Sequence, residues 1–261
     1  IEIILVDNSH IERPSNMFEM ISRNFSAVVL IKNDVNGGYG YGNNVGINAA
    51  KGKYVLILNP DTRLVMPLFK DVVDKFEDDL VAIVGVKLIY EDLKPQISFF
   101  IRPEYQNILT QPLVKLFNKM NFFCDKCMIT SGSCMFIRRS GFAEIGMFDD
   151  QMFLGNEESF IAKKYKSMNS KNRFVFMGGH KIIHLYKECG VSSFSLETLS
   201  RSHAYYFDYF NMSSNFFYYN KLILFYVKYF LSVLGSDEKK KHSLKLEINS
   251  IRSVFRKKYN D

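Results

Sequence analysis

Short apolar runs separated by polar segments characterise the first hundred residues. Runs at 3–6, 27–31, 54–58 and 81–84 are rich in β-branched side chains and bounded by polar residues, as is typical of buried strands. Between them, 16–25 and 68–76 have helical spacing, and a further helix is expected over 43–50. Strands alternating with helices predict an α/β fold with a mostly parallel central sheet covered by helices on both faces.

The rest of the chain is less uniform. Residues 89–128 lack clear periodicity, and we expect an irregular or mobile region there. A strand is predicted over 131–137, and the later elements are a short helix, a longer helix capped by Asn156 and two closing strands (141–145, 157–168, 174–176 and 181–185). These elements predict a first domain over residues 1–196.

Aromatic and aliphatic residues dominate the chain from Tyr205 to Leu234. The run 216–234 approaches the length of a membrane span, but Lys221 and Lys228 interrupt it. Three arrangements stay open: helices packed on the main domain, an in-plane interfacial helix with snorkelling lysines, or a span. In each case residues 197–261 form a helical, aromatic and basic C-terminal extension.

Composition and charge narrow the class of protein. The 261 residues, 47% of them hydrophobic, can bury a sizeable core, which excludes collagen-like and disordered chains. Lysine and arginine outnumber acids by 34 to 27, giving a net charge of +7, and residues 235–261 supply +4 of it. A basic tail behind an aromatic segment indicates an anionic membrane surface or polyanion more than a DNA-reading domain. We therefore expect no nucleic-acid partner.

The four cysteines are too few for a disulfide scaffold, which indicates free thiols in a reducing cytosol. Cys124 and Cys127 form a C-x-x-C without a second pair at zinc-site spacing. The chain opens with Ile1 inside a strand-like run, so we expect native sequence upstream of it.

Polar loops directly follow three of the predicted strands, at residues 7–9, 33–46 and 59–61. In α/β sheets, ligands bind at the loops that leave the carboxyl ends of strands. The glycine cluster at 37–42 fits neither G-x-G-x-x-G nor a P-loop, because no G-K-[ST] follows. It predicts a glycine loop entering a helix whose N-terminus favours an anion, or simply a tight turn.

Three groups of residues are candidates for chemistry. Asp61 follows a buried strand, which suits a divalent cation or an Asx-type turn. Glu157 and Glu158 open a predicted helix about 100° apart, so one of them is a candidate general base, and helix-dipole stabilisation is the alternative. His180 and His184 would share one strand face, where His184 is a metal, phosphate or purely structural residue.

The order of these motifs resembles family 2 glycosyltransferases, with the closest likeness to the bacterial rhamnosyltransferase-like branch. The resemblance covers roughly residues 1–186. The segments that carry it are VDNS (6–9), NGGYGYGNNVGI (36–47), LNPDT (58–62), SGSCMFIRR (131–139), IGMFD (145–149), FLGNEE (153–158) and IH (183–184).

This resemblance implies a GT-A fold and inverting transfer from a nucleoside-diphosphate sugar. It implies that Asp7 recognises the nucleotide base, that Asp61 and His184 approach Mg²⁺ or Mn²⁺, and that Glu158 is the catalytic base, with Glu157 as its rival. The implied donor-binding residues are Asp7, Asn36, Gly37, Gly38, Asn43, Asn44, Asn59 and Asp61. Asn59 replaces a second Asp of many relatives, Glu158 replaces the commoner Asp, and the family's opening strand would lie before Ile1.

The expected function is transfer of a sugar from dTDP-rhamnose or a UDP-hexose to a hydroxyl of a growing, lipid-linked surface polysaccharide. The expected location is the cytoplasmic face of the plasma membrane, where the basic tail would contact anionic lipid. Two alternatives stay open: a truncated GT-A domain without activity, and a nucleotide- or polyanion-binding module.

Overall fold

The computed structural model describes residues 1–9, 20–21, 23–185, 192–234 and 238–260. The predicted helix over 16–25 lies mostly outside these residues. The chain divides into two compact units. We call residues 1–98 and 130–185 the sheet unit, and residues 99–129 and 186–261 the helical unit.

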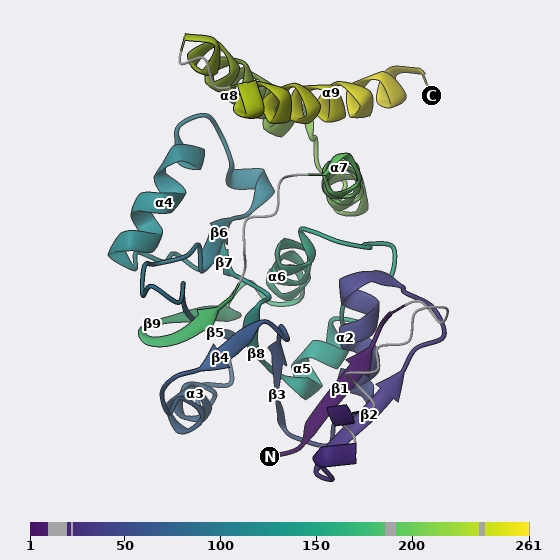
Figure 1. The fold of residues 1–261 in the computed structure, drawn as a ribbon, viewed down its shortest axis with the longest axis vertical. Coiled ribbons are helices and arrows are strands. Elements are labelled where there is room, and N and C mark those ends of the chain that lie inside the picture. Colours follow the sequence, from purple (N-terminus) through teal and green to yellow (C-terminus); the bar gives the residue numbers. More distant parts are fainter. Residues whose placement is uncertain (10–19, 22, 186–191, 235–237, 261) are drawn as a thin grey trace. The chain divides into compact units, whose positions relative to one another are not determined.

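The sheet unit contains a five-stranded sheet with the order β3-β8-β5-β9-β4 and a separate parallel pair, β1-β2 (Figure 1). Their bounds are β1 Ile3–Asp7, β2 Val28–Lys32, β3 Tyr54–Leu58, β4 Thr62–Leu64, β5 Val81–Ile89, β8 Cys134–Arg138 and β9 Arg173–His184. Strand β5 is buried along almost its whole length, and with β8 it forms the centre of the core. All four apolar runs of the first hundred residues form strands, but the expectation that each is buried holds for β5 and not for β1 and β2, where Ile3 and Val29 are exposed.

The α/β class is confirmed, but the five-stranded sheet is mixed. Strand β8 is antiparallel to both β3 and β5, and β4 is antiparallel to β9, whereas β5 and β9 are parallel. The cause is the turn 131–133, from which β8 starts beside the carboxyl end of β3, with Leu58 opposite Cys134. That arrangement places the turn next to the loop that follows β3.

Strand β9 replaces the two predicted closing strands. Its register with β5 jumps between Met177 and Lys181, which pair with the consecutive residues Val86 and Lys87. His180 therefore lies in the irregular part of the strand, where it contacts Asp71 at 2.6 Å. His184, by contrast, contacts Gln96 and lies 3.4 Å from Asp61, and the expectation that the two histidines share one face stays a prediction.

Four helices accompany the sheets: α2 Gly38–Ala49, α3 Phe69–Lys75, α5 Arg139–Glu144 and α6 Glu157–Met168. The bounds of α6 match the prediction. Asn156 holds its N-cap position with a left-handed backbone and no capping side-chain hydrogen bond. Helix α2 begins at Gly38, earlier than the predicted Asn43, so the glycine cluster is itself helical.

The helical unit begins in the segment that we expected to be irregular. It contains β6 Phe99–Ile101, η1 Pro103–Tyr105, α4 Thr110–Met120 and most of β7 Met128–Thr130, whose last residue begins the second part of the sheet unit. The amide of Asn118 on α4 donates to the carbonyl of Phe99 at 3.0 Å, and its oxygen accepts from the Phe99 N–H at 3.2 Å. The expectation of irregularity was wrong: 110–120 forms a helix with apolar residues at helical spacing, and its buried Asn118 fixes it to β6.

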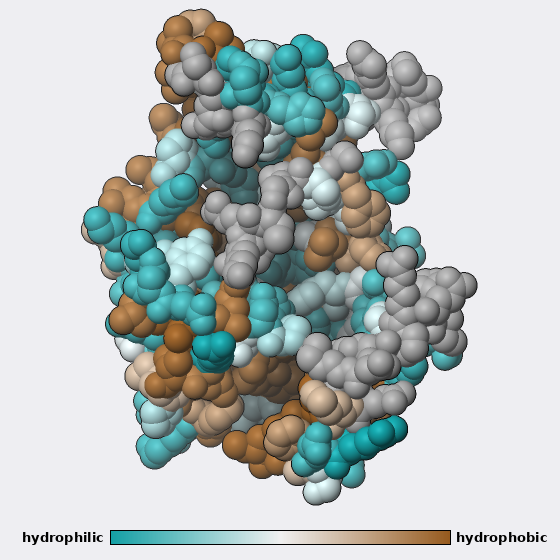
Figure 2. All heavy atoms as spheres, viewed as in Figure 1, coloured by the Kyte–Doolittle hydropathy of each residue, from teal (hydrophilic) through white to brown (hydrophobic). Residues whose placement is uncertain are grey.

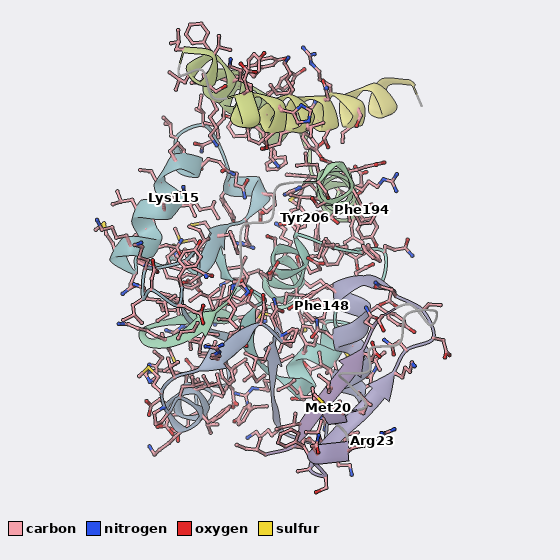
Figure 3. All side chains as sticks on the ribbon, in the orientation of Figure 1. Met20, Arg23, Lys115, Phe148, Phe194 and Tyr206 are labelled. Atoms are coloured by element: carbon pink, nitrogen blue, oxygen red, sulfur yellow. The ribbon has the colours of Figure 1, made fainter. Side chains whose placement is uncertain are left out.

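Three longer helices complete this unit: α7 Ser193–Tyr209, α8 Asn215–Leu234 and α9 Glu238–Asn260. Ser192 caps α7 by accepting from the Ser195 N–H at 3.1 Å. Tyr206 of α7, labelled in Figure 3, is buried, and its hydroxyl donates to Glu104 at 2.6 Å. Helices α8 and α9 lie side by side (Figure 1). Within the described residues, no helix has the length and hydrophobicity that crossing a membrane requires.

Candidate active site

A network of amides joins the carboxyl ends of β1 and β2 to the start of α2. The amide nitrogen of Asn33 donates to Asn8 Oδ1 at 3.0 Å, and Asn8 Nδ2 donates to the Gly38 carbonyl at 2.9 Å. Asn36 Oδ1 accepts from Asn8 Nδ2 at 3.1 Å and from the Gly38 N–H at 3.0 Å. These bonds fix the polar loop at the strand ends, which is where α/β folds bind ligands.

Asp7 closes β1 beside this network, and its side chain is buried. Its Oδ1 accepts from the backbone N–H of Ser9 at 2.9 Å and from the Ser9 hydroxyl at 2.6 Å. Its backbone carbonyl accepts from the Asn33 N–H at 2.9 Å. Asp7 is thus held in one orientation by its own loop, and its predicted contact with the nucleotide base stays a prediction.

Gly38 is the point at which α2 meets the loop before α6. Its φ is +93°, and a Cβ there would lie 2.2 Å from the backbone oxygen of Phe153. The same oxygen accepts from the Tyr39 N–H at 2.9 Å. Only glycine permits this approach, since an added Cβ would meet backbone atoms that cannot turn away.

Replacing Gly38 with alanine should destabilise the protein by roughly 2 kcal/mol or more, because it combines a left-handed backbone with a steric clash. The matched control is Gly179→Ala, where an added Cβ would meet nothing within 4 Å. Urea unfolding of both variants measures the difference, and equal midpoints would contradict this account of Gly38.

Two predicted donor-binding residues are engaged within the protein. Asn44 donates to the Phe148 carbonyl at 2.9 Å and accepts from the Phe148 N–H at 3.1 Å. Asn43 donates to the Tyr39 carbonyl at 2.9 Å. The ring of Phe148, labelled in Figure 3, packs edge-on against Tyr39 and against Phe142 of α5. Asn44 therefore holds α2 to the turn before α6.

The turn 131–133 connects three parts of the site. The Gly132 N–H donates to Glu158 Oε1 at 2.8 Å, and the Gly132 carbonyl accepts from the Tyr39 hydroxyl at 2.9 Å. The Ser133 carbonyl accepts from the Asn59 N–H at 3.0 Å. The sequence analysis did not single out Gly132 or Tyr39 as site residues, although both lie in segments that carry the family resemblance.

Glu157 and Glu158 form a close pair of carboxyl groups at the start of α6. Burial, together with the neighbouring charge of Glu158, raises the pKa of Glu157 from 4.5 to about 7. Burial also raises the pKa of Glu158, against the lowering effect of the Gly132 N–H. Two carboxylates so close resist double ionisation, so near neutral pH one of the pair tends to keep its proton.

Asp61 and His184 are brought together by the pairing of β4 with β9, in which Thr62 lies opposite His184. Asp61 Oδ1 lies 3.4 Å from His184 Nε2. The other ring nitrogen, Nδ1, is 2.9 Å from Gln96 Oε1, while the Gln96 amide nitrogen donates to the His184 carbonyl at 2.7 Å. Gln96, which the sequence analysis missed, thereby fixes both the position and the tautomer of the imidazole.

The tautomer has an electrostatic consequence. Because Gln96 presents an oxygen to Nδ1, that nitrogen carries the proton in the neutral ring, and Nε2 directs a lone pair toward Asp61. Oδ1 of Asp61 is buried without a hydrogen-bond partner among the described residues. Two electron-rich atoms facing each other at 3.4 Å need a proton or a cation between them.

The pair therefore fits a divalent cation, with one carboxylate and one oriented imidazole as ligands and Gln96 in the supporting position. No cluster of three or more His, Cys, Asp or Glu suited to a metal occurs in the described part of the chain. The remaining ligands would come from water and a phosphate-bearing substrate, the usual arrangement for Mg²⁺.

The fold and the site together are those of an α/β protein that has carboxylates and an imidazole near the carboxyl ends of its strands. The profile described as "Glycosyl transferase family 2" matches residues 1–146, which is more than half of the chain. The chain belongs to glycosyl transferase family 2.

Solved structures agree with the fold. The mannosyltransferase PcManGT from Pyrobaculum calidifontis, in complex with GDP-Man and Mn2+, is 12% identical, with a TM-score of 0.58 over all of this chain and 78% of that one. GalNAc-T7 with UDP, GalNAc and Mn2+ is 17% identical, with a TM-score of 0.57 over 80% of this chain. This chain spans 43% of GalNAc-T7. No curated protein matches the sequence. The likeness confirms the GT-A glycosyltransferase fold.

Proposed function

We propose that this protein transfers a sugar, with inversion, from a nucleoside-diphosphate donor to a hydroxyl of its acceptor. The observation that carries the proposal is the Asp61–His184 pair, whose facing oxygen and nitrogen are 3.4 Å apart and suited to a cation. Sugar-nucleotide donors present a diphosphate, which is the ligand that a half-completed divalent site lacks. The structural neighbours, both determined with Mn2+ and a nucleotide or nucleotide sugar, support this.

The proposed reaction is a single displacement. The acceptor oxygen forms a bond to the anomeric carbon while the bond from that carbon to the diphosphate breaks. Glu158 accepts the proton of the acceptor hydroxyl, and the electron pair of the broken bond leaves with the diphosphate. A divalent cation bound at Asp61 and His184 would stabilise the charge that develops on the leaving group.

Two contacts prepare the protein for these steps. The Gly132 N–H orients the Glu158 carboxylate, and the Ser133 carbonyl fixes the loop that leads from Asn59 to Asp61. Because Gly132 and Ser133 are consecutive, the proposed base and the proposed cation ligand are held by the same turn. Asp7 and the amide network of Asn36 and Gly38 would receive the nucleoside at the neighbouring strand ends.

We propose dTDP-rhamnose or a UDP-hexose as donor and a lipid-linked saccharide as acceptor. The donor proposal rests on the sequence resemblance, since the two neighbours carry UDP and GDP-Man and do not choose among nucleotides. The acceptor proposal agrees with the basic, aromatic extension, because a lipid-linked acceptor requires an enzyme that works at an interface.

Thermal unfolding with dTDP, UDP or GDP, each with and without Mn²⁺ or Mg²⁺, tests the donor site. We expect one nucleotide to raise the midpoint only when the metal is present, with a stabilisation of about 2.7 kcal/mol at a hundredfold excess over its dissociation constant. Asp61→Ala should remove the metal-dependent part of the shift. A shift that survives Asp61→Ala, or the absence of a shift with every nucleotide, would contradict the proposal.

A further inference from the structure

One exposed side of helix α8 is uncharged and almost entirely apolar. With 100° between successive residues, its exposed hydrophobic residues fall on one continuous side of the helix. They are Phe216, Tyr219, Ile223, Tyr226, Val227, Phe230, Leu231, Val233 and Leu234. We call this set the α8 face. Phe216 and Phe230 are each 63% exposed, a large share for phenylalanine. Figure 2 shows apolar residues gathered along α8 at the upper left of the view.

The opposite half of α8 packs within the helical unit. Phe217, Leu224 and Phe225 are buried there, and α9 contributes Leu244 and Ile248 to the same core. Lys221 belongs to this side: its Nζ lies 5.1 Å from the centre of the Phe217 ring, and burial lowers the pKa of Lys221 to about 8. Lys228 is exposed, but its Nζ also lies toward this side, 5.5 Å from the centre of the Phe225 ring.

The α8 face therefore contains no lysine. The expectation that the lysines of an interfacial helix would snorkel from its lipid side was wrong for Lys221, whose side chain is directed into the helix packing.

Positive charge nevertheless lines the border of the α8 face. The Arg252 guanidinium of α9 lies 5.5 Å from the centre of the Tyr226 ring, and Lys245 Nζ lies 5.8 Å from that of Tyr229. Together α8 and α9 contain ten lysine and arginine residues against two glutamates, and α8 itself has no acidic residue. An apolar strip bordered by cations is complementary to a bilayer with anionic headgroups.

The start of α4 continues this surface. The Ile108 N–H donates to Asn220 Oδ1 at 3.1 Å, so the next residue, Leu109, lies close to the middle of α8. Leu109 is 74% exposed. Helix α4 has no acidic residue and contributes Lys115 and Lys119.

We propose that the α8 face docks in the plane of an anionic lipid bilayer, with its aromatic and aliphatic side chains at the headgroup boundary. Three features favour lipid over a second copy of the chain. Self-association would bring two strongly cationic borders together, which costs free energy. The tyrosines, with apolar rings and polar hydroxyls, suit the membrane interface. The 20 residues of α8 span about 30 Å, long enough to lie along a bilayer surface.

Sedimentation of the full chain with lipid vesicles tests the proposal. The vesicles contain phosphatidylcholine and phosphatidylglycerol in a ratio of about two to one, and pure phosphatidylcholine is the comparison. The test variant is Ile223→Gln with Phe230→Gln, which removes apolar surface without changing net charge. Its matched control is Val29→Gln with Val73→Gln, two exposed residues of the sheet unit.

We expect the wild type and the control to bind the anionic vesicles, and the test variant to lose roughly tenfold or more in partitioning. Equal binding of test variant and wild type would overturn the proposal, because the basic residues alone would then account for it. So would a wild type that does not bind, or one that is a dimer in solution while the test variant is a monomer.

The docking face does not rest on the transfer chemistry, so the two proposals fail separately. The test variant should keep the metal-dependent nucleotide shift of the wild type, which also shows that it is folded. Loss of that shift together with vesicle binding would contradict a role confined to docking.

Discussion

Replacing Glu158 with glutamine should lower the transfer rate by about a thousandfold, within the range that general-base catalysis contributes. Glutamine keeps an oxygen that can accept the Gly132 N–H, which Glu158 accepts at 2.8 Å, so the fold and the donor site should persist. Transfer to a soluble acceptor, measured by release of nucleoside diphosphate, gives the rate. An unchanged nucleotide-dependent thermal shift in the same variant would separate lost chemistry from lost binding.

Glu157→Gln is the control, and it should change the pH dependence of transfer. The base must be ionised, and burial raises the pKa of Glu158, so transfer by the wild type should rise with pH above the ordinary range of a carboxyl group. Removing the neighbouring charge lets Glu158 ionise more readily, and the acid limb of the profile should move to lower pH. If Glu157→Gln abolishes transfer while Glu158→Gln retains it, the two roles are exchanged.

The same variant should change the pH dependence of stability. Because the pKa of Glu157 is raised from 4.5 to about 7, the folded state binds more protons than the unfolded state between these two pH values. The wild type should therefore lose stability relative to Glu157→Gln as the pH rises through that window, on the order of 2 kcal/mol in all. Urea unfolding at acidic and alkaline pH measures the effect, and parallel profiles would contradict it.

Asp61→Asn should reduce transfer by roughly a thousandfold at saturating metal, because it removes the carboxylate that faces His184 Nε2. The variant should also need far more Mn²⁺ to reach its residual rate, which a titration of activity with metal detects. The substitution preserves the size of the side chain, and the backbone carbonyl at this position would still accept from the Leu185 N–H, so the protein should remain folded.

The chain offers a matched control in a second aspartate–histidine pair. Asp71 contacts His180 at 2.6 Å on the surface of the same unit, at a distance that a hydrogen bond accounts for. Asp71→Asn should leave both transfer and the metal requirement unchanged. If it impairs transfer as much as Asp61→Asn does, the effect belongs to general electrostatics and not to a cation site.

Local pattern predicted two elements together with their bounds. The run at 54–58 and the helix 157–168 were found with their observed bounds, since each is delimited by polar residues at both ends. Helix α4 was missed although Leu113, Leu116, Phe117 and Met120 recur at helical spacing. The side chain that fixes this helix to β6 is a buried amide, that of Asn118, which an apolar pattern does not reveal.

The residues of the candidate site also fall into a group that was predicted and a group that was missed. Asp61 and His184 were expected at the metal from the resemblance, and the structure brings them within 3.4 Å of each other. Gln96 and Gly132 were not found, because their roles depend on pairings between distant strands and on a close approach of backbone. The positioning role of such residues, which act through the main chain or through one side-chain amide, cannot be predicted from a single sequence.

The segment 99–129 leaves the sheet unit and returns to it at a point where the two ends of the excursion are hydrogen-bonded to each other. Ser98 and Ser131 flank the excursion, and the Ser131 N–H donates to the Ser98 carbonyl at 2.9 Å. Exchanging this segment between relatives would leave the hydrogen bond between Ser98 and Ser131 in place. The exchange would, however, remove the hydrogen-bond partners of two residues outside the segment: Glu104, which accepts from Tyr206, and Ile108, which donates to Asn220. A functional chimera must therefore exchange residues 99–129 and 186–261 together, because the two segments form one unit.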